Sequence, residues 1–143
     1  MNEEMLKLDN QLCFAMYAAS KEITRLYKPF LDKLGITYTQ YITLLVLWEK
    51  DNITVKELGD KLYLDSGTLT PLLKKLESMD IVSRNRDTKD ERNVYVLLTT
   101  KGKELKNSAL EIPHNIFCGI GLSIEDAVDL KQRLKDLLAY MRE

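Results

Sequence analysis

The sequence has few of the residues from which enzyme active sites and secreted scaffolds are usually built. Its 143 residues include one histidine and only two cysteines, Cys13 and Cys118. These three residues do not form a metal-ligand set, and two distant cysteines do not form a disulfide framework. There is no Cys-x-x-Cys pair, no glycine-rich nucleotide loop and no Ser-His-Asp set. We therefore expect neither an enzyme nor a bound cofactor or metal.

Long hydrophobic runs are also missing. No apolar stretch approaches the roughly 20 residues that a membrane helix needs. The first residues, Met1-Asn2-Glu3-Glu4-Met5, lack the basic start and cleavage site of a signal peptide. Hydrophobic residues make up 45% and charged residues 30% of the chain, as in globular proteins. We expect a cytoplasmic, folded protein with a single domain over residues 1–143.

The formal net charge is only −1, but the charges are distributed unevenly. Residues 71–106 carry nine basic and six acidic side chains, whereas residues 1–70 and 107–143 are each net negative. Local charge matters more than total charge for a surface that meets phosphate. The middle of the chain is therefore the candidate for nucleic-acid contact.

Hydrophobic periodicity predicts helical regions at both ends, over residues about 5–34 and 101–142. Within the first, Pro29 predicts a kink or a restart. The second continues a helix that starts at Thr99-Thr100, has a weak point at Gly102 and is interrupted at Pro113, and a loop is expected around Gly119 and Gly121.

The centre of the chain, residues 38–100, combines helical and strand patterns. Residues 38–50 are apolar nearly all round, which is typical of a helix inside a core. Thr54 and Glu57 have capping-box spacing and predict a short helix to Leu62, and Asp65 caps a helix over 66–79. After residue 80 the period becomes two, which predicts strands at 81–86 and 93–98 around a charged tip. This order is that of a winged helix-turn-helix, so we expect a mainly α fold with a small β-hairpin wing.

The helix predicted over 66–79 begins with small polar residues, which let a helix N-terminus approach the floor of the major groove. The arginines of the hairpin suit the narrow minor groove. A polar helix start alone is usually a cap, and a charged hairpin tip is usually a solvated turn. Their combination in this order indicates DNA binding by Ser66, Thr68, Thr70, Lys74, Lys75, Arg84, Arg86, Lys89 and Arg92.

These residues resemble those of the MarR family of bacterial transcriptional regulators. The family's wing signature, Asp-x-Arg-Asp-x-Arg, corresponds to residues 87–92, with Lys89 in place of the first arginine. That replacement weakens any bidentate contact from this position. The resemblance implies that Arg92 enters the minor groove and that Asp90 orients it.

The stretch 63–74 is similar to the recognition helix of the family's organic-hydroperoxide-sensor (OhrR) branch and of related staphylococcal redox regulators, and it adds Pro71 to the candidate DNA contacts. The resemblance further implies a homodimer held by the terminal helices. It implies a repressor that binds an inverted-repeat operator in double-stranded DNA.

The residues around the two cysteines leave several interpretations open. Cys13 between Leu12 and Phe14 fits a small buried hydrophobe. It also fits a peroxide-reactive thiolate, which needs a helix N-terminus or hydrogen-bond donors to stabilise it. Tyr17 follows one helical turn later and is a candidate hydrogen-bond donor to this thiolate, although tyrosines at this spacing are more often core residues.

The hydroperoxide sensors carry a reactive cysteine in the setting Gln-Leu-Cys-Phe, which is residues 11–14 here. In that branch two tyrosines donate hydrogen bonds to the sulfur across the dimer interface, and Tyr27 and Tyr38 occupy the matching places. The resemblance implies that an organic hydroperoxide oxidises Cys13, that Cys118 of the partner subunit forms an intersubunit disulfide with it, and that the operator is released. In the alternative one-cysteine scheme, a small thiol caps Cys13 and Cys118 is incidental.

Three other functions remain open. A MarR-type repressor can be released by a small phenolic ligand, for which Tyr17, Tyr27, Tyr38 and Trp48 are candidate pocket residues. A thiol peroxidase would turn over many equivalents of peroxide. A winged helix used only for protein contacts would not bind DNA at low salt.

Overall fold

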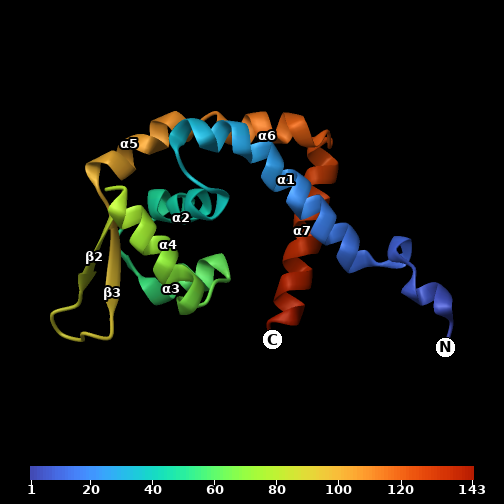
Figure 1. Ribbon diagram of the computed structural model, residues 1–143, viewed down its shortest axis with the longest axis horizontal. Coiled ribbons are helices and arrows are strands. Elements are labelled where there is room, and N and C mark those ends of the chain that lie inside the picture. The colour runs from blue at the N-terminus through green and yellow to red at the C-terminus, as the bar shows by residue number, and fades with distance from the viewer. The chain divides into compact units, whose positions relative to one another are not determined.

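The computed structural model describes residues 1–143 as two compact units, Met1–Leu110 and Glu111–Glu143. Both are drawn in Figure 1. The first unit contains the short 3-10 helices η1 (Glu3–Leu6) and η2 (Leu8–Asn10), then α1 (Leu12–Leu34), α2 (Tyr38–Glu49), β1 (Ile53–Thr54), α3 (Val55–Leu62), α4 (Ser66–Ser78), β2 (Val82–Arg86), β3 (Val94–Leu98) and α5 (Thr100–Ala109). The second unit contains α6 (Ile112–Ile120) and α7 (Ile124–Met141). The expected mainly α fold with a small β wing is confirmed.

The N-terminal helix is shorter than predicted. The expectation of one helix from residue 5 is wrong because Gln11 adopts an extended backbone and its side chain donates hydrogen bonds to the carbonyls of Met5 and Lys7. These bonds hold the segment before α1 in 3-10 turns. The predicted restart at Pro29 is also absent, since α1 continues without a break to Leu34 and ends at the left-handed Gly35.

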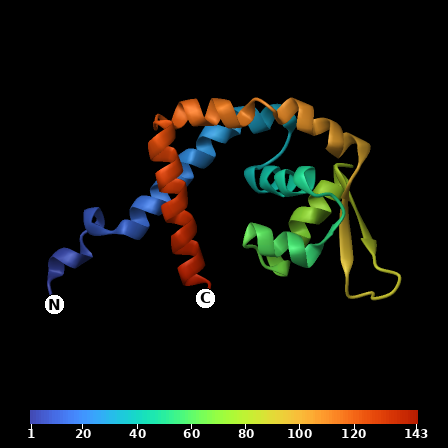
Figure 2. The same ribbon diagram turned by 180° about the vertical axis from the view of Figure 1, so that it is seen from behind.

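The winged region is built on a three-stranded antiparallel sheet in the order β1-β3-β2. Ile53 of β1 pairs with Val96 of β3, and Val82 of β2 pairs with Leu98. Strand β1 was not predicted because its two residues are too few to show the alternation of a strand. Both views show the β2–β3 hairpin projecting beyond α3 and α4 (Figures 1 and 2).

The core of this unit lies between α2, α4 and the sheet. Helix α2 begins with a capping box of Thr37 and Gln40. Its buried side chains include Tyr41, Leu44 and Leu47. The predicted Thr54 cap is confirmed, since its hydroxyl accepts a hydrogen bond from the backbone N–H of Glu57, whose carboxylate pairs with Lys50.

Gly102 fixes α5 against the sheet rather than weakening the helix. A methyl group there would collide with the carbonyl oxygen of Ile81 and would lie 3.1 Å from Leu98 Cδ2. The indole N–H of Trp48 donates a 2.9 Å hydrogen bond to the Gly102 carbonyl. The predicted weak point is therefore a close-packed contact that requires a residue without a side chain.

The C-terminal helices α5, α6 and α7 depart from prediction near their prolines and glycines. Helix α5 ends at Ala109, earlier than expected, and Pro113 lies in the first turn of α6, where its missing N–H needs no partner. Gly119 is helical, so the predicted loop is confined to the residues after Ile120, where Gly121 is left-handed. Helix α7 is capped by Ser123 and has no buried residue. None of the helices is both long and apolar enough to cross a bilayer.

We expect Gly102→Ala to lower the free energy of unfolding by about 2–3 kcal/mol, because the added methyl group forces α5 away from Ile81. Denaturant unfolding at fixed protein concentration measures the change. Gly67→Ala is the matched control, since a methyl group there meets only Asp65 Oδ1 at 3.4 Å and should leave stability unchanged or slightly raised. Equal midpoints for Gly102→Ala and the unsubstituted protein would contradict this account.

Candidate functional site

Helices α3 and α4 form a helix-turn-helix whose geometry is set by the turn between them. Tyr63 ends α3 in the left-handed conformation, at φ 57°. Gly59 lies against this turn, and a Cβ there would be 2.8 Å from the Leu64 carbonyl oxygen. A side chain at position 59 would therefore displace this turn, which determines the direction in which α4 begins.

Asp65 caps α4 by accepting a 2.8 Å hydrogen bond from the backbone N–H of Thr68. This bond, followed by one from the Thr68 side chain, lowers the pKa of the Asp65 carboxyl. The ionised carboxylate sits at the positive end of α4, where it stabilises the helix. The same negative charge reduces the attraction of this helix end for phosphate, so the basic side chains around it matter more for that attraction.

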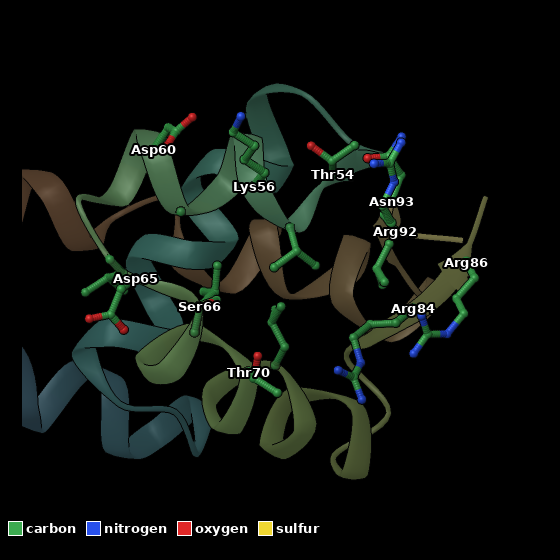
Figure 3. A pocket seen from close by; sticks show the side chains of 16 residues that line it. Thr54, Lys56, Asp60, Asp65, Ser66, Thr70, Arg84, Arg86, Arg92 and Asn93 are labelled. Atoms are coloured by element: carbon green, nitrogen blue, oxygen red, sulfur yellow. The ribbon is translucent and has the colours of Figure 1, made fainter. Parts of the chain in front are cut away.

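A concave surface lies between α3, the first half of α4 and the wing, and it encloses a volume of about 500 Å³ (Figure 3). Four basic and two acidic side chains line it. Five of the predicted DNA-binding residues converge there, namely Ser66, Thr70, Arg84, Arg86 and Arg92. Figure 3 shows Ser66 and Thr70 on α4 and the arginines on the facing hairpin.

The other six candidates lie outside the concave surface. Five of them are exposed on α4 or on the wing tip, and Asp90 is half-buried; they are Thr68, Pro71, Lys74, Lys75, Lys89 and Asp90. Prediction missed Lys56 and Asn93, which line the surface. An isolated lysine in a helix with mixed charges and an asparagine at a strand start carry no distinctive signal.

Arg92 is held in a defined orientation by Asp90. Its Nε and Nη2 each donate a 3.0 Å hydrogen bond to a different carboxylate oxygen. The pair lowers the pKa of Asp90 and raises that of Arg92. The Arg92 side chain is 90% exposed, so a preoriented cation projects from the wing.

Arg84 is paired in a different way. It donates hydrogen bonds of 3.2 and 3.3 Å to Glu77 on α4, and these lower the pKa of Glu77. The pair joins the end of α4 to β2 and leaves only 24% of the Arg84 side chain exposed. Arg86 instead donates to the backbone carbonyl of Glu91 in the hairpin tip. Glu77 was not predicted, because a glutamate in a helix usually faces solvent.

Cys13 lies in the first turn of α1 and is exposed, which rules out the buried-hydrophobe interpretation within one chain. The free N–H groups of a first helical turn attract negative charge. Tyr17 follows one turn later, with its ring 6.4 Å from that of Phe14 and 5.2 Å from the Lys21 ammonium.

Tyr27 and Tyr38 come together, as their shared predicted role requires. Their ring centroids are 4.9 Å apart, and Tyr41 lies 5.5 Å from Tyr27. Burial, followed by the neighbouring Tyr38 and Tyr41, raises the pKa of Tyr27 to about 12. Burial also raises the pKa of Tyr38, so both phenols keep their protons and can donate hydrogen bonds. Tyr41 was missed because its spacing in an apolar helix is that of a core residue.

These tyrosines cannot reach the Cys13 of their own chain. Fourteen residues of α1 separate Cys13 from Tyr27, which is about 21 Å along a helix axis. A hydrogen bond to the sulfur therefore requires a second subunit. Cys118 is exposed on α6, with its Sγ 3.7 Å from Nε2 of His114.

The four aromatic residues predicted to line a ligand pocket do not all lie together. A groove of about 540 Å³ along α1 is lined by Tyr17, Lys21, Arg25 and Tyr38, among others, but by neither Tyr27 nor Trp48. Trp48 packs against Tyr41 and Gly102 instead. The four aromatic residues therefore do not form one pocket.

Comparison with known proteins identifies the family. Residues 25–109 match the family model for the transcriptional regulators SarA/Rot. The organic hydroperoxide resistance transcriptional regulator of Bacillus subtilis (strain 168) is 52% identical over 138 residues, which cover 96% of this chain and 91% of that protein. The chain belongs to the MarR/SarA family of winged-helix transcriptional regulators. The resemblance to the OhrR branch is confirmed by the same match.

Solved structures of the MarR/SarA family agree with this assignment. The reduced form of AbfR bound to DNA matches all of this chain and all of that one, with a TM-score of 0.81 and 35% identity. A disulfide-formed structure of AbfR, which is a protein of Staphylococcus epidermidis, matches 95% of this chain and 96% of that one, with a TM-score of 0.62 and 35% identity. This chain is accordingly a DNA-binding transcriptional regulator and not an enzyme.

We expect Arg92→Gln to weaken binding to operator DNA about 10-fold and to reduce the salt dependence by about one phosphate contact. The reason is that this preoriented cation is the most exposed of the wing's ion-paired arginines. Fluorescence anisotropy over a series of salt concentrations measures both effects. Lys131→Gln on α7 removes the same charge elsewhere and is the control; equal losses for the two variants would contradict a specific role for Arg92.

The tyrosine cluster predicts a loss of stability at alkaline pH. The folded-state pKa of Tyr27 is about 12, whereas that of a free tyrosine is about 10. The contribution of Tyr27 to the free energy of unfolding is therefore fully present below about pH 10 and decreases as the pH rises towards about 12. Tyr27→Phe should remove this part of the pH dependence. Denaturant unfolding between pH 8 and pH 11, about the working range for tyrosine titration, measures it, and an unchanged dependence in the variant would contradict the assignment.

Proposed function

We propose that this regulator is a homodimeric repressor that senses organic hydroperoxides through Cys13. The observation that carries the proposal is the exposed position of Cys13 in the first turn of α1, in a chain 52% identical to a regulator of organic hydroperoxide resistance. An oxidant can reach a sulfur placed there, and the free backbone N–H groups of a first helical turn attract negative charge.

The second subunit is proposed from apolar surface that one chain leaves uncovered. Only Leu31 is buried among the 23 residues of α1, and nothing is buried in α7. Exposed apolar residues at the two ends of the chain include Leu8, Leu12, Phe14, Ile124, Val128 and Leu134. Terminal helices of two chains that pack together would bury these residues and form the dimer.

In such a dimer the two α4 helices would enter successive major grooves, about 34 Å apart, on an inverted-repeat operator. Arg92, oriented by Asp90, would enter the adjacent minor groove. The relative AbfR was solved bound to DNA in its reduced form and also in an overoxidized form, which supports reduced protein as one DNA-binding form and indicates that oxidation alone does not prevent DNA binding in that relative.

The sensing step begins with attack of the Cys13 thiolate on the outer oxygen of a hydroperoxide. The O–O bond breaks, Cys13 becomes a sulfenic acid, and the organic part leaves as an alcohol after taking up a proton. Tyr27 and Tyr38 of the partner subunit would donate hydrogen bonds to the sulfur, which their protonated state allows. The thiol of Cys118 of the partner subunit would then attack the Cys13 sulfur, so that a disulfide forms and water leaves.

The disulfide would act on DNA binding through geometry. A disulfide requires Cα atoms within about 7 Å, so its formation fixes the C-terminal region of one chain against α1 of the other. A change that alters the spacing of the α4 helices need supply only about 2.7 kcal/mol of differential affinity for a 100-fold change in occupancy. The disulfide form of AbfR supports such a state in a relative.

We expect Cys13→Ser to bind operator DNA normally and to remain bound after peroxide treatment, because the reacting sulfur is gone. Cys118→Ser is the comparison variant, which should still be oxidised at Cys13 but form no cross-linked dimer. Gel shifts and non-reducing gels after one equivalent of cumene hydroperoxide measure release and cross-linking. Peroxide-dependent release of Cys13→Ser would contradict the proposal.

The electrostatic part of DNA binding has its own test. If each subunit neutralises about four phosphates, the logarithm of the binding constant should fall with the logarithm of salt concentration with a slope on the order of −7. No binding to DNA even at low salt would instead favour a winged helix that contacts only proteins.

The groove along α1 supports a second candidate, release by a small phenolic ligand. Tyr17 and Tyr38 supply aromatic surface there, and Lys21 supplies a cation. Mass spectrometry after hydroperoxide treatment separates the candidates, since an unmodified Cys13 would favour the ligand.

A further inference from the structure

Helix α6 carries the chain's single histidine one turn before its second cysteine. The i, i+4 spacing places His114 and Cys118 on the same face, with Nε2 and Sγ 3.7 Å apart. They are the only titratable side chains between Ile112 and Ile120, and both are exposed. The charged groups next to α6 in the chain are Glu111 before it, and Glu125 and Asp126 in the first turn of α7.

The position of Cys118 makes a proton acceptor necessary. Only a thiolate attacks another sulfur, and about 3% of an ordinary cysteine is ionised at pH 7. Cys13 lies in the first turn of α1, where backbone N–H groups are free, whereas Cys118 lies in the last turn of α6, where backbone carbonyl groups are free. The imidazole of His114 is the group within reach of the Cys118 sulfur that can accept its proton.

We infer that His114 accepts the proton of the Cys118 thiol during the attack on oxidised Cys13, an inference that rests on the proposed function. As the proton moves from Sγ to Nε2, the sulfur of Cys118 forms a bond with the Cys13 sulfur of the other chain. The S–O bond of the sulfenic acid breaks, and the departing hydroxide takes the proton from the imidazolium to leave as water. The imidazole is neutral again, and the organic hydroperoxide that formed the sulfenic acid is the only oxidant consumed.

Geometry at the sulfur agrees with this role. A neutral imidazole has one nitrogen that accepts a hydrogen bond, and imidazole is mainly neutral at pH 7. Nε2 is the nitrogen that faces Sγ, so the tautomer with its proton on Nδ1 accepts directly from the thiol. Because both side chains are exposed, replacing His114 should not disturb the packing of Ile112 and Ile116, the buried residues of α6.

The first experiment uses the full-length Cys13→Ser protein, in which Cys118 is the only thiol, and so does not depend on peroxide sensing. We expect His114→Gln to slow alkylation of Cys118 by iodoacetamide about 5-fold at pH 7, with an upper limit of about 30-fold set by the ionised fraction of an ordinary thiol. The difference should disappear at about pH 10, where an ordinary cysteine thiol is almost fully ionised without a base. Asn115→Gln, at the neighbouring exposed position, is the matched control.

Equal alkylation rates at pH 7 with and without the His114→Gln substitution would overturn the inference. A difference that persists unchanged at high pH would overturn it as well, because a purely structural effect on access would act at every pH.

The second experiment follows cross-linking in the protein that retains Cys13, after one equivalent of cumene hydroperoxide. We expect His114→Gln to slow disulfide formation severalfold while the rate of sulfenic acid formation at Cys13 stays the same. Slower alkylation with unchanged cross-linking would overturn the role of His114 in this step. If the unsubstituted protein forms no cross-linked dimer, the Cys13–Cys118 pairing itself fails, and alkylation distinguishes that failure from the absence of proton transfer.

Discussion

The pairing of the two-residue strand β1 with the middle of β3 determines where the DNA-facing surface lies. Ile53 is buried opposite Val96, and α3 begins directly after Thr54. The helix-turn-helix is thereby tied to the wing by backbone hydrogen bonds rather than by flexible side chains. Strand β1 leads directly into α3 and pairs with β3 of the hairpin, so the concave surface between α3, α4 and the hairpin has a defined shape before DNA binds. A preformed surface loses less conformational entropy on binding.

Ion pairs divide the basic residues of this surface into different roles. The ion pair between Glu77 and Arg84 joins α4 to β2 and leaves little of the Arg84 side chain exposed to a ligand. Asp90 orients Arg92 but leaves it exposed, so its charge remains available to a ligand. Counting positive residues in the sequence treats these arginines as equal, whereas their carboxylate partners make one a structural link and the other a projecting contact.

Much of the fold follows from local sequence signals. The caps at Thr54 and Asp65 and the change of period after α4 predict the helix-turn-helix and the wing. Failures occur where contacts distant in sequence decide the structure. Gly102 looks like a helix defect until Ile81 is placed against it, and the 3-10 turns before α1 depend on bonds from Gln11. For the site, the family resemblance predicts that Tyr27 and Tyr38 act together on a cysteine of the other chain. The structure brings the two rings together, and the length of α1 keeps Tyr27 away from Cys13 of its own chain.

The apolar side of α7 has no cover within the chain, since none of its residues is buried. In the proposed homodimer, a second copy that covers this side would stabilise the folded state by mass action, so the midpoint of thermal unfolding should rise with protein concentration. For the proposed repressor, the concentration of the protein would then affect how long each copy survives. At low protein concentration, cellular proteases would remove each copy faster than at high concentration. The amount of regulator available to bind an operator would therefore change more steeply than its rate of synthesis.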